Sequence, residues 1–276
     1  MFDVKYVDNK IYIKNVKNFD LEQTFNCGQA FRWNMDKNGV WQGVANNKHI
    51  KLYHDNDDIV ILNSSKQDFE NYWYDYFDLS CDYNAIISEL SHNEILRNIC
   101  NFGSGIRILK QDTWEALCSF IISQNNNIPR IKGIIESLCK NFGEKCEDFY
   151  SFPSAEKIAV LEVEDLAVLK CGFRARYILD AARKVSSKEI ELNEFKRCDT
   201  ENVRNQLMKI TGVGPKVADC TMLFGLYRID AFPQDVWIKR AMANLFPQGL
   251  PDCAKNHPGI VQQYIFYYSR SGNLEL

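Results

Sequence analysis

The chain has 276 residues, of which 46% are hydrophobic and 25% charged, a composition ordinary for a globular protein of one to three domains. A formal net charge of −3 excludes a histone-like coat of positive charge, and no apolar run is long enough for a membrane span. The first residues also lack the apolar core of a signal peptide, so we expect none.

Ten cysteines are scattered along the chain between Cys27 and Cys253, without any C-x-x-C pair. A scattered set in a chain of this size suits reduced thiols better than a disulfide framework. The cysteines and the four histidines also lack the ligand spacing of a zinc site or an iron–sulfur cluster. We therefore expect no metal site built from them.

Residues 1–65 have the pattern of strands. Apolar and polar residues alternate over 10–16, and the pair Asn38-Gly39 lies between two apolar runs, which is typical of a hairpin turn. The segments 49–54 and 58–62 continue the alternation. This part of the sequence predicts a meandering antiparallel sheet.

From residue 68 onward the hydrophobic period changes to that of helices. Strong amphipathic stretches cover 113–123 and 128–143, with Gly143 as the expected C-cap. Two helices are expected around Cys171-Gly172, and the last helix covers 259–269. The pattern predicts an α+β protein. An N-terminal antiparallel β-sheet domain, 1–104, would pack on a mostly α-helical domain, 105–276.

Residues 210–220 read ITGVGPKVADC, a short turn between two helical patterns. Gly212 and Gly214 allow a backbone turn that residues with a Cβ would resist, and Pro215 suits the first position of a helix. Lys216 then lies at a helix N-terminus, whose free N–H groups form a natural seat for phosphate. On this pattern alone Lys216 is more often a solvated phosphate contact than a nucleophile.

Further motifs extend the pattern along nearly the whole chain. Asp235 follows Lys216 by nineteen residues, and six segments occur in a fixed order: CGQAFRW, GIRILKQD, FIISQNNNIPRI, CGFRARYI, LMKITGVGPKVADC and VQQYIF. Together they resemble the helix–hairpin–helix glycosylase superfamily, and within it the 8-oxoguanine DNA glycosylases of the eukaryotic-type branch. The hairpin alone would be weakly specific, because many DNA-binding proteins use it.

The resemblance implies a base-excision repair enzyme, both N-glycosylase and DNA lyase. It would flip 8-oxoguanine out of duplex DNA, excise it through a lysine Schiff base and nick the strand by β-elimination. Lys216 would be the nucleophile, and Asp235 would stabilise positive charge on the sugar. The residues of the base pocket would be Gly28, Cys220, Gln262 and Phe266.

The resemblance also assigns residues to the rest of the DNA. Those that fill the void and bind the orphan cytosine, hence a preference for cytosine opposite the lesion, would be Asn125, Arg130, Phe173 and Arg174. The phosphate contacts of the hairpin region would be Gly212, Gly214 and Trp237. Two positions depart from the family pattern: Phe173 stands where tyrosine is usual, and Trp237 where the eukaryotic enzymes carry histidine.

The branch implied by the resemblance needs no cofactor, although hairpin carbonyls can hold a monovalent cation. We expect a monomer whose partner is double-stranded DNA containing 8-oxoguanine, with no membrane and no protein partner indicated. The expected compartment is the bacterial cytoplasm, at the nucleoid, or the nucleus if the source is eukaryotic.

Two other functions remain open at this point. A glycosylase of the same fold could act on another lesion such as alkylated purines, although those relatives generally keep the aspartate without the lysine. A non-enzymatic DNA-binding module would use the hairpin only to hold phosphates and would bind duplexes in a salt-sensitive way.

Overall fold

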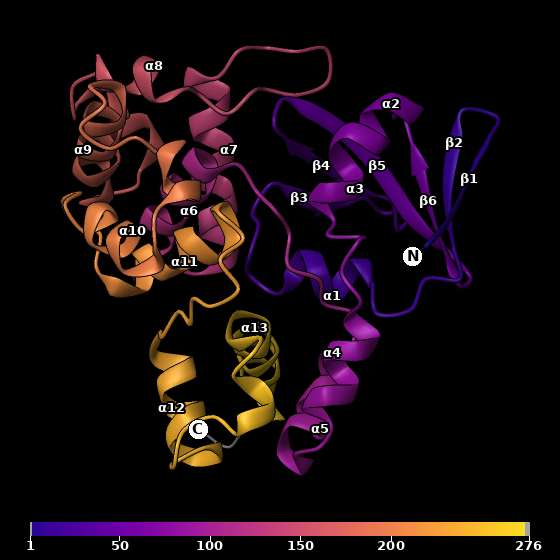
Figure 1. Ribbon diagram of the computed structural model, residues 1–276. Helices are drawn as coiled ribbons and strands as arrows, with labels where there is room; N and C mark the ends of the chain where they lie inside the picture. The colour runs from indigo at the N-terminus through magenta and orange to yellow at the C-terminus, as the bar shows by residue number, and fades with distance from the viewer. Residues whose placement is uncertain (1, 274–276) are drawn as a thin grey trace.

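A computed structural model describes residues 2–273 and contains one six-stranded sheet (Figure 1). The strands are β1 (Asp3–Val7), β2 (Lys10–Lys14), β3 (Trp33–Met35), β4 (Trp41–Ala45), β5 (Lys48–Asp55) and β6 (Asp58–Leu62). Every pairing is antiparallel, as predicted, and the order is β1-β2-β6-β5-β4-β3. The predicted meander is confirmed from β1 to β2 and from β3 to β6, but it is wrong between β2 and β3, because β2 pairs with β6 instead, Tyr12 lying opposite Val60.

The sheet is held by apolar side chains that alternate along its strands. Ile50 and Leu52 of β5 are fully buried, while the residues on either side of each are partly exposed. The ring of Trp33 stacks on Phe25 at a centroid distance of 3.9 Å. Phe25 belongs to a short helix, α1 (Leu21–Asn26), in a region for which only strands were predicted. Asp20 caps this helix by accepting a hydrogen bond from the backbone N–H of Gln23.

Apart from its loops and turns, the rest of the described chain, up to residue 273, is mostly helical. The α-helices are α2 (Lys66–Asp68), α3 (Tyr74–Tyr76), α4 (Tyr83–Leu90), α5 (Glu94–Gly103), α6 (Thr113–Ser123), α7 (Ile128–Phe142), α8 (Ala155–Ala159), α9 (Arg174–Ser186), α10 (Thr200–Leu207), α11 (Pro215–Gly225), α12 (Val236–Leu245) and α13 (Pro258–Tyr268). The short 3-10 helices are η2 (Asp165–Leu169), η3 (Glu194–Arg197) and η4 (Asp252–Ala254), and the π-helical segments are η1 (Phe69–Trp73) and η5 (Ser269–Asn273).

The two amphipathic stretches predicted most clearly are confirmed as α6 and α7. Gly143 is the C-cap of α7, and its N–H bonds to the carbonyl of Cys139. A Cβ at Gly143 would lie 2.0 Å from the carbonyl oxygen of Ser151, which explains the glycine. Where two helices were expected around Cys171-Gly172, the structure has three segments, α8, η2 and α9. Lys170 has a left-handed backbone and ends η2 before α9 begins.

Two hydrophobic cores underlie the α+β architecture. One core is formed by side chains of the sheet, α1 and η1. The other is formed by side chains of α4, α5 and the helices from α6 to α13. In Figure 1 the sheet lies beside the helical body, and α4, α5, α12 and α13 form a group below both. The buried residues of α4 and α5, which precede residue 104, thus belong to the helical core. The proposed domain boundary at residue 104 stays a prediction. No helix within residues 2–273 is long and apolar enough to cross a membrane.

Candidate active site

The predicted hairpin is formed by α10, a tight turn and α11. Gly212 has a φ of +80°, and a Cβ there would lie 2.3 Å from the ring of Tyr177. Pro215 takes the first position of α11, and the N–H of Thr211 donates to Asp180 on α9. The expectation that the turn needs a glycine at position 214 is wrong, because the φ of −98° there is open to any residue and a Cβ would meet nothing within 4 Å. Gly214 instead leaves the surface at this helix N-terminus unobstructed.

Backbone carbonyls of the hairpin would hold the expected monovalent cation, and two of them already accept hydrogen bonds. The carbonyl of Lys209 already accepts a hydrogen bond from the ammonium group of Lys184, at 2.6 Å. The carbonyl of Ile210 accepts one from the N–H of Val213 at 3.0 Å. Carbonyl oxygens can accept twice, so the cation stays a prediction. Among residues 2–273 no group of three or more His, Cys, Asp or Glu side chains could hold a metal ion.

Lys216 is half-buried in the first turn of α11. Its Nζ lies 3.2 Å from the Oγ of Ser123, and 5.3 Å from the centre of the Phe120 ring. The Ser123 hydroxyl donates its own hydrogen to the carbonyl of Phe120 at 2.8 Å. Its lone pairs therefore face Lys216, so that Ser123 accepts from the amine. Neither Phe120 nor Ser123 was predicted from the sequence, because only the packing of α6 against α11 brings them to the lysine.

Asp235 is the N-cap of α12, and its Oδ1 accepts a hydrogen bond from the N–H of Ile238 at 2.8 Å. This bond fixes the carboxylate while no described residue donates to Oδ2. Lys216 and Asp235 come from two different helices, yet both line the same cavity. The oriented carboxylate thus faces the same cavity as the amine.

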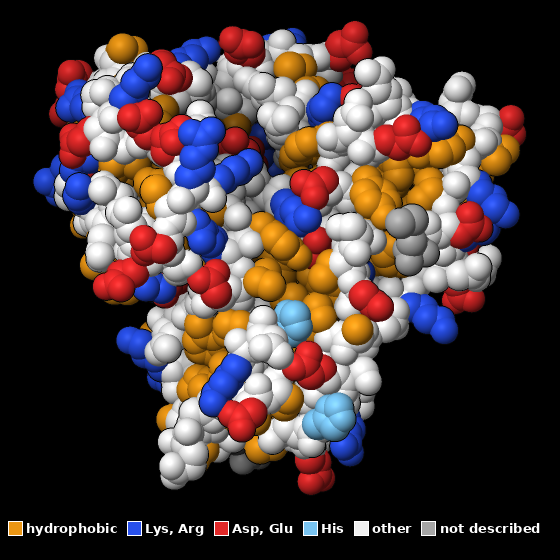
Figure 2. Space-filling view, viewed as in Figure 1, with side chains coloured by type: hydrophobic (Ala, Val, Ile, Leu, Met, Phe, Trp, Pro, Cys, Tyr) orange, Lys and Arg blue, Asp and Glu red, His pale blue; other side chains and the backbone are white. Residues whose placement is uncertain are grey.

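The cavity has a volume of about 340 Å³, within the range of small-ligand sites. Five residues predicted for the site line it: Gly28, Lys216, Asp235, Trp237 and Phe266. Residues that the sequence analysis did not assign also line it: Phe31, Phe120, Ser123, Asn126, Asn127, Ile128, Pro129, Ile131 and Arg270. Figure 2 shows hydrophobic side chains gathered where the sheet, the helical body and the lower group of helices meet, with cationic side chains along the helical body.

Gly28 and Phe266 lie next to each other in the wall of the cavity. Gly28 has a φ of +83°, and a Cβ there would lie 3.3 Å from the Phe266 ring and 3.4 Å from the Cδ1 of Ile128. Phe266 also carries the guanidinium of Arg270 over its ring, at 5.4 Å. The spacing of four residues on one helical segment was the signal that could have indicated Arg270. A glycine here leaves room beside the ring.

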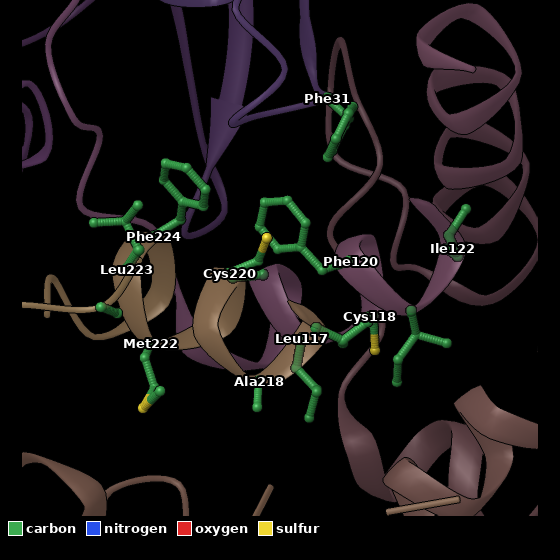
Figure 3. Packing of buried hydrophobic residues seen from close by; sticks show 14 of the residues in the cluster. Phe31, Leu117, Cys118, Phe120, Ile122, Ala218, Cys220, Met222, Leu223 and Phe224 are labelled. Carbon is green, nitrogen blue, oxygen red and sulfur yellow. The ribbon is translucent and has the colours of Figure 1, made fainter. Parts of the chain in front are cut away.

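Two predicted pocket residues are buried behind this lining. Gln262, on α13, is 5% exposed, and its Oε1 has no hydrogen-bond partner among the described residues. Cys220 lies one turn after Lys216 on α11, and Figure 3 draws it beside the Phe120 ring. Burial raises the pKa of the Cys220 thiol to about 11. The thiol is therefore neutral near pH 7.

The other predicted DNA contacts gather where α6, α7 and α9 approach one another. Asn125 adopts a left-handed φ of 45°, and its carbonyl accepts from the Nη2 of Arg174 at 2.7 Å. Arg174 is only 3% exposed and also binds the carbonyls of Gln124 and Cys171. Arg130 and Phe173 are exposed, and Phe173 carries the Arg174 guanidinium over its ring. Arg174 thus holds the loop of Asn125, and its contact with cytosine stays a prediction.

Comparison with known proteins gives two adjoining family matches. Residues 11–117 match the 8-oxoguanine DNA glycosylase N-terminal domain, and residues 118–250 match the HhH-GPD superfamily of base excision DNA repair proteins. The N-glycosylase/DNA lyase of Saccharomyces cerevisiae is 42% identical over 152 residues, which are 49% of this chain and 40% of that protein. The chain thus matches less than half of the yeast protein's length.

Two solved structures resemble the whole chain. MBOgg1, in complex with a low-affinity DNA ligand, is 42% identical with a TM-score of 0.92, and the match covers 99% of this chain and 100% of that one. The 8-oxoguanine glycosylase/lyase of Clostridium acetobutylicum, bound to duplex DNA with cytosine opposite 8-oxoG, is 38% identical. Its TM-score is also 0.92, with 99% of each chain covered.

Proposed function

Because the chain belongs to the 8-oxoguanine DNA glycosylase family of helix–hairpin–helix repair proteins, we propose that it excises 8-oxoguanine from duplex DNA and then nicks the strand. One observation carries the proposal: an amine from α11 and a carboxylate from α12 line one cavity of base-binding size. Its place of action is with DNA, at the nucleoid in a bacterium or in the nucleus of a eukaryote.

Lys216 is the nucleophile in this proposal. Its Nζ attacks the anomeric carbon C1′, and the bond from C1′ to the base breaks with its electron pair leaving on the base, which takes up a proton. The sugar ring opens to a Schiff base with the lysine. Loss of a C2′ proton then expels the 3′ phosphate by β-elimination and nicks the strand. Water finally hydrolyses the Schiff base and releases the enzyme.

Asp235 stabilises the positive charge that the sugar develops as the base departs. A carboxylate that is already oriented by its bond to the N–H of Ile238 needs no rearrangement when that charge appears. The Ser123 hydroxyl keeps the amine of Lys216 in the same cavity. Attack and charge stabilisation are therefore assigned to two separate groups.

Gly28, Gln262 and Phe266 recognise the extruded base in this proposal, with Cys220 on its other face. The Gly28 carbonyl accepts the N7 hydrogen that 8-oxoguanine has and guanine lacks, whereas guanine would face it with a lone pair. The Oε1 of Gln262, which has no hydrogen-bond partner within residues 2–273, supports a role at the Watson–Crick edge, where N–H groups of the base can satisfy it. Phe266 offers its ring as a stacking surface.

The remaining contacts hold the duplex. Asn125 fills the void left by the extruded base, Phe173 wedges the stack, and Arg130 and Arg174 bind the orphan cytosine. Arginine donors suit cytosine's acceptors, which gives a preference for cytosine opposite the lesion. The hairpin at Gly212 and Gly214 and the exposed Trp237, whose indole N–H can donate, contact phosphates.

Borohydride trapping on a duplex with one 8-oxoguanine opposite cytosine tests this function. We expect a covalent protein–DNA adduct with the native chain and with Lys209→Ala, an exposed lysine of the same hairpin, but none with Lys216→Ala. An undamaged duplex should give no adduct. Base release from an alkylated duplex without any adduct would instead identify a glycosylase for other lesions. DNA binding without adduct or release would identify a DNA-binding module.

A further inference from the structure

Three consecutive carbonyls follow α1, and they differ in their partners. The carbonyl of Cys27 accepts a hydrogen bond from the Nε2 of Gln263 at 2.8 Å. The carbonyl of Gln29 accepts one from the Nε2 of Gln111 at 2.7 Å. Between them, the carbonyl of Gly28 receives no hydrogen bond from any described residue. The one free acceptor of the three thus belongs to the residue that lines the cavity.

These bonds come from elements remote in the sequence. Gln263 lies on α13 and is 2% exposed, and its Nε2 donates to the carbonyl of Cys27. The fully buried side chain of Gln29 donates to the carbonyl of Arg107 at 2.8 Å and accepts from the N–H of Leu109 at 2.9 Å. The peptide before Gly28 and the residue after it are both fixed.

Glycine needs such support, because it populates positive and negative φ about equally when nothing restrains it. Gly28 is held at a φ of +83°. The bond from Gln263 acts on the Cys27–Gly28 peptide, whose orientation is coupled to that φ. Without it, we expect Gly28 to sample conformations in which its carbonyl turns away from the base.

We infer that Gln263 is a positioning residue for lesion specificity, because it fixes the Cys27–Gly28 peptide and so aims the Gly28 carbonyl. This inference rests on the proposed function, in which that carbonyl accepts the N7 hydrogen of 8-oxoguanine. Gln263 itself does not line the cavity. Its effect should therefore appear only with a base that carries an N7 hydrogen.

The test measures dissociation constants of the whole chain for three duplexes, with Gln263→Met and the control Gln67→Met, an exposed glutamine of α2. The duplexes carry 8-oxoguanine, 8-oxo-7-deazaguanine or a tetrahydrofuran abasic analogue. The deaza base has carbon in place of N7 and so lacks the N–H donor. Each base is attached to a 2′-fluoro sugar, which resists cleavage because fluorine destabilises positive charge at C1′. Methionine keeps the side-chain length and removes the amide donor.

Gln263→Met should weaken binding of the 8-oxoguanine duplex by about fivefold, the range of one hydrogen bond, and leave the other two duplexes unchanged. Gln67→Met should change none of them. An equal loss on all three duplexes, or no loss on 8-oxoguanine, would overturn the inference. A matched duplex that carries guanine on the same 2′-fluoro sugar tests the proposed function itself, which would fail if the native chain bound 8-oxoguanine no better than guanine.

Discussion

The Nζ of Lys216 lies 3.2 Å from the Oγ of Ser123, the last residue of α6. The serine hydrogen is directed to the carbonyl of Phe120, so the hydroxyl can only accept from the lysine. A typical intramolecular hydrogen bond contributes about 0.5–1.5 kcal/mol. This bond therefore restrains the amine without fixing it in place.

Replacing Ser123 by alanine should slow Schiff-base formation by about 3- to 10-fold at saturating DNA, because the amine loses its restraint in the cavity. The measurement is single-turnover borohydride trapping. Ser137→Ala on α7 is the control, since the exposed hydroxyl of Ser137 has, among the described residues, a side-chain hydrogen bond with Asn141 alone, one turn later. Equal rates for Ser123→Ala and the native chain would show that the bond does not orient the nucleophile.

Gly28 and Gly39 form a matched pair, with φ values of +83° and +79°. An alanine at either site should cost about 1 kcal/mol of folding free energy, because left-handed backbone disfavours a Cβ. Only at Gly28 would the methyl group approach Phe266 and Ile128, whereas at Gly39 it meets nothing within 4 Å. We therefore expect Gly28→Ala to lose base excision and Gly39→Ala to retain it.

Urea unfolding and single-turnover excision, measured on both variants, separate the two effects. Similar losses of stability with activity lost only in Gly28→Ala would support the base pocket. Full excision by Gly28→Ala would show that Gly28 is not part of the base pocket.

The helices and the site motifs could be predicted because their signals are local. The stretches at α6 and α7 carry a 3.6-residue period over eleven and fifteen residues, long enough to be read without tertiary context. The six residues of α1 are too few for that, and the pairing of β2 with β6 depends on contacts across some fifty residues of chain. The roles of Ser123 and Gln263 were also hidden, because a polar residue's partner across the fold has no sequence period.

Gly212 and Gly214 should respond in opposite ways to alanine. At Gly212 the added Cβ would lie 2.3 Å from the Tyr177 ring at a φ of +80°, so Gly212→Ala should destabilise the protein by about 2–4 kcal/mol. At Gly214 the Cβ enters open space, so folding should be unaffected. Gly214→Ala should instead weaken duplex binding, because the methyl group stands where a phosphate would approach the helix N-terminus.

Thermal unfolding and binding titrations at two salt concentrations measure these effects. Unchanged DNA affinity in Gly214→Ala would show that the phosphate lies elsewhere.

Glu115 gives the fold a pH dependence of its own. It lies in the first turn of α6 with a side chain 14% exposed, and its Oε2 is 3.4 Å from the Nη1 of Arg32. Burial raises the pKa of this carboxyl from 4.5 to about 7, although Arg32 opposes the shift. Between these two values the folded chain keeps a proton that the unfolded chain has lost. Stability from this group is therefore full below about pH 4.5 and declines as the pH rises to 7.

The decline should reach about 3 kcal/mol at most by pH 7.5, since each pKa unit corresponds to about 1.4 kcal/mol. Glu115→Gln should abolish it, because the amide stays neutral in both states and can still accept from Arg32. The measurement is the change in unfolding free energy from pH 5 to pH 7.5, compared between the native chain and the variant so that other titrating groups cancel. Glu164→Gln, at an exposed position, should leave the change as it is in the native chain. If Glu115→Gln also followed the native pH dependence, Glu115 would titrate alike in both states, and its burial beside Arg32 would carry no proton linkage.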